Sequence, residues 1–167
     1  HSEDAGCNRA VLQQFIPAGF SIRLATQDDV PELMALEPYW RSRALEADEA
    51  TLRRRITNHS GQYVAAAPDG RLLGVMYTQR VGSYGDLLTA ERESELYLHV
   101  KGGPVVQLLG VLSVPNAQVA DPLRKLVLLQ GRLDATVQLA CGITRCRNYE
   151  ESCGDYESYV KAGSDPG

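Results

Sequence analysis

Hydrophobic and polar positions change their spacing several times along the chain, and each change marks an expected element. Phe20 to Ala25 alternates with a period of two, which is typical of a strand. Thr26 then provides an N-cap for a helix that Pro38 ends. A second helix is expected from about Asp48 to Asn58. The inward faces of these helices are expected to carry Val30, Leu33, Met34 and Leu36 in the first, and Leu52 and Ile56 in the second.

The middle of the chain predicts a hairpin and an irregular connection. Tyr63 to Ala67 and Leu72 to Arg80 have the composition of strands, and Pro68-Asp69-Gly70 between them is typical of a tight turn. Asp86 to Leu96 predicts a short helix followed by a loop. Gly102-Gly103-Pro104 then breaks the chain before the next element.

A long apolar run, Val105 to Val114, predicts a buried central strand. Asp121 and Pro122 are expected to be the N-cap and first residue of a third helix, and Gln138 to Thr144 a further strand. The buried side of that helix is expected to hold Leu123, Leu126, Val127 and Leu133. The resulting order, β-α-α-β-β-β-α-β, predicts a mixed α/β fold with antiparallel strands first and one β-α-β crossover late.

The chain has 167 residues, which is enough for one domain with its own core. Residues 1–18 are polar and are expected to form a linker or leading arm, so residues 19–167 make up the predicted domain. The polar tail from residue 145 predicts a short helix around Asp155 to Lys161.

Composition narrows the classes of partner. The net charge of -4 and the absence of a basic stripe interleaved with aromatic residues argue against a nucleic-acid surface. The run Arg53-Arg54-Arg55 lies in a helical pattern and is interpreted as a solvated helix face. No apolar run reaches the ~18–20 residues of a membrane span, and the N-terminal residues lack a signal-peptide pattern.

The four cysteines, Cys7, Cys141, Cys146 and Cys153, form no C-x-x-C pair. Without a secretion signal, they are expected to be reduced thiols in the cytoplasm. Their spacing and the lack of histidine partners also argue against a zinc site, so no metal is expected.

The loop between the central strand and the third helix gives two opposing indications. A strand that leads into a helix N-terminus is where a protein can hold a phosphate, because free N–H groups and the helix dipole point there. Yet Gln118 to Pro122 contains no glycine, Pro122 removes one N–H donor, and Asp121 adds a negative charge. Tight binding of a pyrophosphate is therefore not expected from these residues.

Three phrases resemble the GNAT-like domains of polyketide synthase loading modules, which have the fold of the GNAT acetyltransferase superfamily. They are Glu37-Pro38-Tyr39-Trp40, the segment Leu108 to Pro115, and Gly142-Ile143-Thr144-Arg145-Cys146-Arg147-Asn148-Tyr149. The resemblance covers about residues 19 to 162. It implies a mixed-sheet α/β fold that receives coenzyme A or phosphopantetheine thioesters between two splayed strands. It also implies decarboxylation of malonyl-type thioesters, or acyl transfer to a carrier protein.

The resemblance carries specific residues with it. Thr144 is implied to hydrogen-bond the reacting acyl group, and Trp40 to close the acyl chamber. The residues implied to hold the thioester arm are Leu112, Ser113, Val114, Gln118, Val119 and Ala120. The implied partners are an acyl carrier protein and neighbouring synthase domains, such as a methyltransferase.

The chain also departs from the family pattern. The family has a catalytic histidine roughly 34 residues after the position of Thr144, which lies past Gly167, and the final strands of the fold lie there too. His1, His59 and His99 are not expected to replace that histidine. Two hypotheses follow: a degenerate domain that serves as a structural companion to a neighbouring domain, or an active decarboxylase whose C-terminal part is missing here. A third, weaker hypothesis is an N-acetyltransferase for an amine.

Overall fold

The computed structural model describes residues 19–40, 45–90 and 97–142, and its centre is a five-stranded sheet. The strands lie in chain order, β1-β2-β3-β4-β5. The first four are antiparallel to their neighbours, and β5 pairs with β4 in parallel, as the β-α-β crossover predicted. The strands are β1 (Ser21–Leu24), β2 (Tyr63–Ala66), β3 (Leu72–Val81), β4 (Val105–Ser113) and β5 (Leu139–Gly142).

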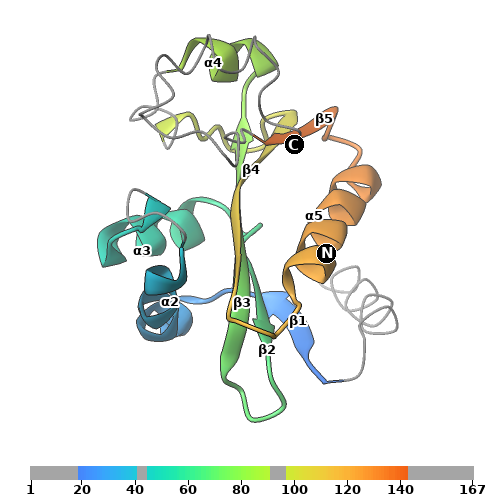
Figure 1. The fold of residues 1–167 in the computed structure, drawn as a ribbon. Coiled ribbons are helices and arrows are strands. Elements are labelled where there is room, and N and C mark those ends of the chain that lie inside the picture. The colour runs from blue at the N-terminus through green and yellow to red at the C-terminus, as the bar shows by residue number, and fades with distance from the viewer. Residues whose placement is uncertain (1–18, 41–44, 91–96, 143–167) are drawn as a thin grey trace, which may run out of the picture.

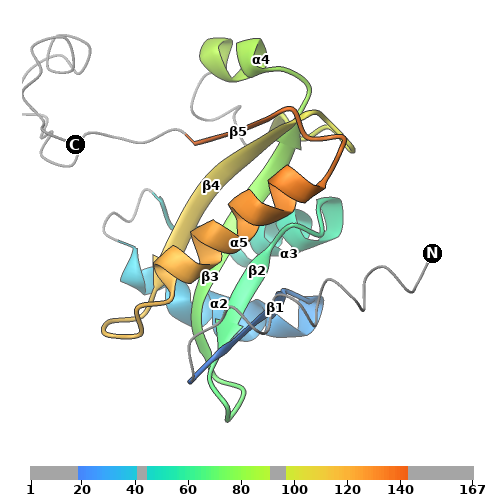
Figure 2. The same cartoon turned by 90° about the vertical axis from the view of Figure 1, so that its right-hand side faces the viewer.

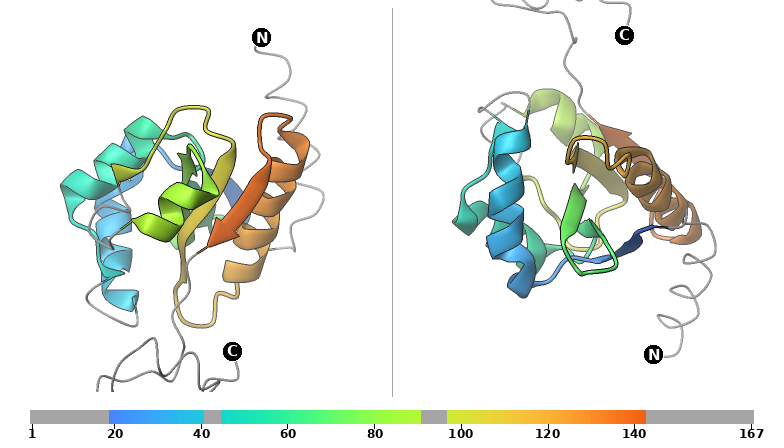
Figure 3. Two further views of the ribbon diagram at one scale, coloured as in Figure 1. Left: turned by 90° about the horizontal axis from the view of Figure 1, so that it is seen from above. Right: turned by 60° about the horizontal axis from the view of Figure 1, so that its bottom comes forward.

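Helices cover both faces of this sheet (Figures 1 and 3). Helix α5 (Ala120–Leu133) crosses one face, as Figure 2 shows, and α2 (Val30–Leu36) and α3 (Glu49–Asn58) cover the other. The short α4 (Tyr84–Thr89) lies at the end of the sheet where β3 finishes. The three layers bury an apolar cluster on each face of the sheet, and a third, smaller cluster joins Leu87 of α4 to Val81 and Val105.

The first helical segment is divided into three pieces. A 3-10 turn at Gln27–Asp29 precedes α2, and a second one at Glu37–Tyr39 follows it. The predicted stop at Pro38 is confirmed, since α2 ends at Leu36. Asp29 contributes to the start of this segment by an ion pair with Arg23, in which the nitrogen and oxygen are 2.6 Å apart.

The predicted hairpin is confirmed between β2 and β3. The chain reverses at Gly70, whose φ of 90° is costly for residues with a side chain. The Gly70 N–H donates to the Ala67 carbonyl at 2.9 Å.

Strand β4 contains an irregularity that shapes the rest of the molecule. Tyr77 pairs with Gly110 and Thr78 with Leu108, so Leu109 is an extra residue without an opposite partner on β3. Because of this bulge, Leu109 and Gly110 both face the side of the sheet that α2 and α3 cover. Two consecutive residues of one strand thus contribute to the same surface.

The start of α5 differs from the expectation that Asp121 is its N-cap. The helix begins at Ala120, Val119 is its N-cap residue, and no side chain makes a capping hydrogen bond. Val119 is fully buried, and it lies so close to β3 that a Cβ on Gly74 would be 2.6 Å from Val119 Cγ2. Burial of Val119 therefore brings the chain into the helix two residues earlier than Asp-Pro indicates.

The face of α5 is otherwise as expected, with one exception. Leu123, Leu126 and Val127 are buried as predicted, but Leu133 is 63% exposed. Leu133 is the last residue of the helix. The expected helix at residues 155–161 and the last two residues of the strand predicted to end at Thr144 lie outside the described residues.

Candidate active site

Trp40 lies directly against the bulge of β4. A Cβ added to Gly110 would be 2.8 Å from Cη2 of the Trp40 indole, which is closer than atoms in contact approach. Only a glycine allows the ring to pack this closely on the strand. The resemblance had implied that Trp40 closes an acyl chamber, and the structure places it over the middle of β4.

A buried carboxylate holds this ring in place. Glu37 is 3% exposed and accepts a hydrogen bond at 3.0 Å from Nε1 of Trp40. It also accepts from the Ala47 backbone N–H at 2.6 Å and from the Tyr77 hydroxyl at 3.3 Å. Three donors from three segments thus converge on one carboxylate, which fixes the indole relative to β3 and β4.

Tyr77 and Arg55 extend this arrangement toward α3. The guanidinium of Arg55 lies 4.7 Å from the centre of the Tyr77 ring, in a cation–π contact. Burial raises the pKa of the Tyr77 hydroxyl, and the nearby Glu37 carboxylate raises it further. Burial lowers the pKa of the Arg55 guanidinium, although Tyr77 and Glu37 oppose that shift. We call Glu37, Trp40, Arg55 and Tyr77 the Glu37 cluster.

The interpretation of Arg53-Arg54-Arg55 as a solvated face is wrong for Arg55. Arg53 is 46% exposed and pairs with Glu49, as expected for a surface residue. Three consecutive helical residues, however, span about 200° around the axis, so they cannot all face solvent. Arg55 follows the buried Leu52 by one turn and points toward the sheet, and Arg54 lies over the Tyr97 ring at 4.9 Å.

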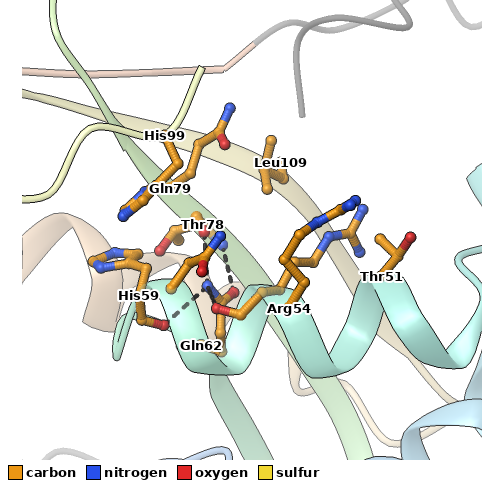
Figure 4. A pocket seen from close by; sticks show the side chains of 10 residues that line it. Thr51, Arg54, His59, Gln62, Thr78, Gln79, His99 and Leu109 are labelled. Carbon is orange, nitrogen blue, oxygen red and sulfur yellow. Dashed lines mark hydrogen bonds between the residues drawn. The ribbon is translucent and has the colours of Figure 1, made fainter. Parts of the chain in front are cut away.

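A small cavity lies between α3 and the sheet beside Leu109 (Figure 4). Its volume is about 20 Å³, which is room for about one water molecule. Four of the ten described residues that line it carry basic groups, and none carries a carboxylate. The lining consists of Thr51, Arg54, Arg55, Asn58, His59, Gln62, Thr78, Gln79, His99 and Leu109.

The fold brings His59 and His99 together at one side of this cavity, with ring centres 5.6 Å apart. Burial lowers the pKa of His59 to about 4, with contributions from His99 and Arg80. Nε2 of His99 is buried without a hydrogen-bond partner among the described residues. A larger groove of about 390 Å³ begins at the same pair and continues toward the C-terminal end of α5.

Beyond the bulge, no described residue pairs with the edge of β4 next to β5. Pairing between the two strands runs from Val105 with Leu139 to Leu108 with Gly142, where the described part of β5 ends. Past Leu108, the strand has no partner on this edge among the described residues. Backbone N–H and C=O groups on an open edge can bind an extended arm that carries amides.

The residues implied to hold such an arm are distributed along this edge and the following loop. The side chain of Leu112 belongs to the buried core, and the Ser113 hydroxyl donates to the Val114 carbonyl at 3.2 Å. These two residues thus offer mainly their backbone to a ligand. Gln118 is exposed with a φ of 53°, and Ala120 is the first residue of α5.

The start of α5 is less obstructed than the sequence suggested. Val119 and Leu123 are both fully buried, so their side chains point into the core and not into the space before the helix. The Asp121 carboxylate does not cap the helix but pairs with Arg124 at 2.8 Å. The N–H groups at this end are therefore not covered by Asp121, although Pro122 still lacks one.

The other implied catalytic residue, Thr144, lies outside the described residues. Gly142, the last described residue of β5, precedes it by two positions. Among the described residues, no three histidine, cysteine or acidic side chains are grouped as metal ligands would be. In the same part of the chain, no helix is long and apolar enough to cross a membrane.

Two solved structures resemble this chain over most of its length. The GNAT-like decarboxylase of GphF, in complex with isobutyryl-CoA, is 32% identical with a TM-score of 0.73, covering 86% of this chain and 77% of that one. The loading GNAT-like domain of CurA from Lyngbya majuscula is 30% identical with a TM-score of 0.72, covering 78% and 67%. The chain belongs to the GNAT-like loading domains of polyketide synthases. The predicted α/β fold is thereby confirmed for this GNAT-like domain.

More distant structures share only the fold of this loading domain. An aminoglycoside 6'-N-acetyltransferase from Acinetobacter baumannii is 14% identical, with a TM-score of 0.54 over 87% of this chain and 88% of that one. No protein-family model and no curated protein sequence matches the chain.

Sequence reasoning missed most of the Glu37 cluster in this loading domain. Glu37 belongs to the segment Glu37-Pro38-Tyr39-Trp40, which resembles the family, but its contact with Tyr77 spans 40 positions and has no local signal. Arg55 was detectable, because a helix that buries Leu52 and Ile56 must also turn position 55 inward.

Proposed function

We propose that this chain removes CO2 from a malonyl-type thioester to supply the starter unit of a polyketide. The thioester arm lies along the open edge of β4, and its acyl group reaches the bulge at Leu109 and Gly110. There the carbon–carbon bond to the carboxylate breaks, and its electron pair forms an enolate. A proton from solvent then completes the product, an acetyl thioester from malonyl or a propionyl thioester from methylmalonyl.

One observation carries this proposal: on β4, a wall that is fixed in position lies next to the last residue that pairs with the described part of β5. Trp40 packs on Gly110, and its indole N–H is held by the buried Glu37 carboxylate. A wall fixed by a paired, buried network suits a reaction in which the acyl group must be held in one orientation. The acyl-CoA complex of GphF supports a thioester of the same kind as the substrate.

The chemistry needs groups that stabilise the enolate oxygen while CO2 leaves. Hydrogen-bond donors aimed at that oxygen lower the barrier most. We assign this role to the Thr144 hydroxyl and to N–H groups on the open edge of β4, the threonine on the family resemblance alone. Trp40 and Leu109 form the apolar wall beside the acyl group.

The substrate can arrive on coenzyme A or on the phosphopantetheine arm of an acyl carrier protein. The start of α5 offers some donors to a pyrophosphate but lacks the glycines of strong binders. We therefore favour delivery by a carrier protein, with neighbouring synthase domains beside this one in a cytoplasmic assembly.

The test is mass spectrometry of malonyl- and methylmalonyl-loaded carrier protein after incubation with the chain. We expect loss of CO2, and we expect Trp40→Ala to slow it while Tyr39→Ala, at an exposed neighbouring position, does not. Intact malonyl groups after prolonged incubation with the wild-type chain would contradict the proposal.

A second candidate function is a non-catalytic companion to a neighbouring domain. The segment Gln118–Pro122, which lacks glycines, supports it. This candidate predicts no binding of malonyl-CoA or acetyl-CoA in calorimetry and no effect of Trp40→Ala on the assembly's products. Micromolar binding of either thioester would exclude it.

A further inference from the structure

Arg55, in the Glu37 cluster, is a charged side chain with an unused hydrogen-bond donor. Its Nε is buried without a hydrogen-bond partner among the described residues. Its guanidinium stacks on the Tyr77 ring at 4.7 Å, and no ion pair holds it in the described part of the chain. The buried Nε therefore has a hydrogen bond to offer, and a ligand that accepts it would satisfy this donor.

The surroundings of Arg55 favour an anion. Arg54, His59 and His99 line the same cavity, and no carboxylate does so among the described residues. The buried Glu37 carboxylate, whose charge also acts on Arg55, already accepts hydrogen bonds from three donors. An incoming negative charge thus meets attraction from two guanidinium groups and no opposing charge in the cavity lining.

The cavity adjoins the place where the acyl group is proposed to lie. Leu109 lines the cavity and Gly110 contacts Trp40, and these two residues are neighbours in the bulge, both facing α3. An acyl group against Trp40 would therefore have this cavity beside it, on the side of Leu109. The free volume of about 20 Å³ means that a carboxylate entering it displaces solvent and that lining side chains move outward.

We propose that Arg55 binds the carboxylate of the malonyl-type substrate and so selects carboxylated thioesters. This inference rests on the proposed function. Arginine suits the task because its planar fork makes two parallel hydrogen bonds to a carboxylate. The carboxylate leaves as CO2, so Arg55 stabilises the bound substrate more than the transition state.

This role has a specific kinetic consequence. Loss of an interaction made in the ground state raises KM and leaves kcat unchanged or higher. Arg55→Gln is expected to raise KM for malonyl thioesters by about 10- to 100-fold, the range for a hydrogen bond to a charged group. Arg55→Lys keeps the positive charge but loses the planar guanidinium, so its KM is expected to lie between those of the wild-type chain and Arg55→Gln.

Binding tests the inference separately from turnover. Sulfoacetyl-CoA, in which a sulfonate stands in place of the carboxylate and cannot leave as CO2, is compared with acetyl-CoA by calorimetry. The wild-type chain is expected to prefer the sulfonate by tenfold or more, and Arg55→Gln to lose that preference. Arg53→Gln, on the exposed side of the same helix, is the matched control and is expected to keep it.

The outcomes separate the two proposals. The wild-type chain can prefer the sulfonate through Arg55 and yet release no CO2 from malonyl thioesters. That result supports the anion site and contradicts the decarboxylase. Equal affinity for both probes in the wild-type chain overturns the role of Arg55 whatever the activity. If circular dichroism shows that Arg55→Gln is unfolded, Arg55→Lys is tested in its place. A preference of Arg55→Lys for sulfoacetyl-CoA over acetyl-CoA that equals the wild-type preference also overturns the proposal.

Discussion

The two ends of the stretch of β4 that pairs with no described residue on the β5 side are built in different ways. At the acyl end, Glu37 receives three hydrogen bonds while nearly fully buried, and Trp40 packs on Gly110 within contact distance. At the other end, α5 begins without a side-chain cap, and the charged residue there, Asp121, forms an exposed pair with Arg124. Buried, paired groups are costly to change, whereas an exposed pair contributes little.

This difference indicates where the molecule's specificity lies. The acyl end fixes the position of one aromatic ring, so it can discriminate between acyl groups. The end where α5 begins offers helix N–H groups, but it has no glycines that would let a phosphate approach the backbone closely. We infer that the domain recognises the acyl group of the thioester more strictly than the coenzyme A or carrier protein to which that group is attached.

The largest effect is expected from removing the carboxylate of the Glu37 cluster. Glu37→Ala leaves the Trp40 and Tyr77 donors buried and unpaired, so the free energy of unfolding should fall by about 3 kcal/mol or more. Chemical denaturation measures the loss. The emission of Trp40, the single tryptophan, should shift to longer wavelength as the ring becomes solvated.

Glu49→Ala is the control, because this exposed carboxylate pairs with Arg53 on the same face of the molecule. It should cost less than about 1 kcal/mol. If both variants lose a similar free energy of unfolding, the Glu37 cluster is no more firmly held than an ordinary surface pair.

A smaller effect is expected from Gly110→Ala. The added methyl group would lie 2.8 Å from the Trp40 ring, so the ring must move. Overpacking of this kind costs about 1–3 kcal/mol. Thermal unfolding should show the loss, and CO2 release should decrease together with it. Gly85→Ala, where the nearest atom is 3.6 Å away, should leave activity unchanged.

The sequence predicted the elements better than the site, for physical reasons. Alternation and apolar spacing identified β2, β3, β4 and the buried side of α5, because local burial imposes those periods. The start of α5 was misplaced since burial of Val119 against Gly74 outweighed the local preference of Asp-Pro. The contacts of Glu37 with Tyr77 and of His59 with His99 join segments 40 positions apart, which no local pattern encodes.

His59 gives a prediction about pH. Its pKa is lowered to about 4, whereas the unfolded chain has the ordinary value near 6.5. Between these values the unfolded state binds more protons, so stability should decrease as pH falls from 6.5 to 4. Thermal unfolding across this range measures the slope, and His59→Asn should make it shallower. An unchanged slope in that variant would show that burial does not lower the pKa of His59 in the folded chain.

The smallest effect on stability is expected from Asp121→Asn. The pair with Arg124 is exposed, so unfolding should change by less than about 1 kcal/mol. Removing the negative charge should strengthen binding of acyl-CoA a few-fold, because the pyrophosphate no longer meets it. Calorimetry with acetyl-CoA tests this, and acetyl-pantetheine, which lacks phosphate, should bind both forms alike.

The most direct test compares the same malonyl group as a thioester of three different carriers. The rate of CO2 release, as kcat/KM, is measured for malonyl-loaded carrier protein, malonyl-CoA and malonyl-pantetheine. If the acyl end determines recognition, all three should be turned over, and malonyl-CoA should exceed malonyl-pantetheine by only a few-fold. Turnover of malonyl-CoA alone, or no CO2 from any of the three, would contradict the account.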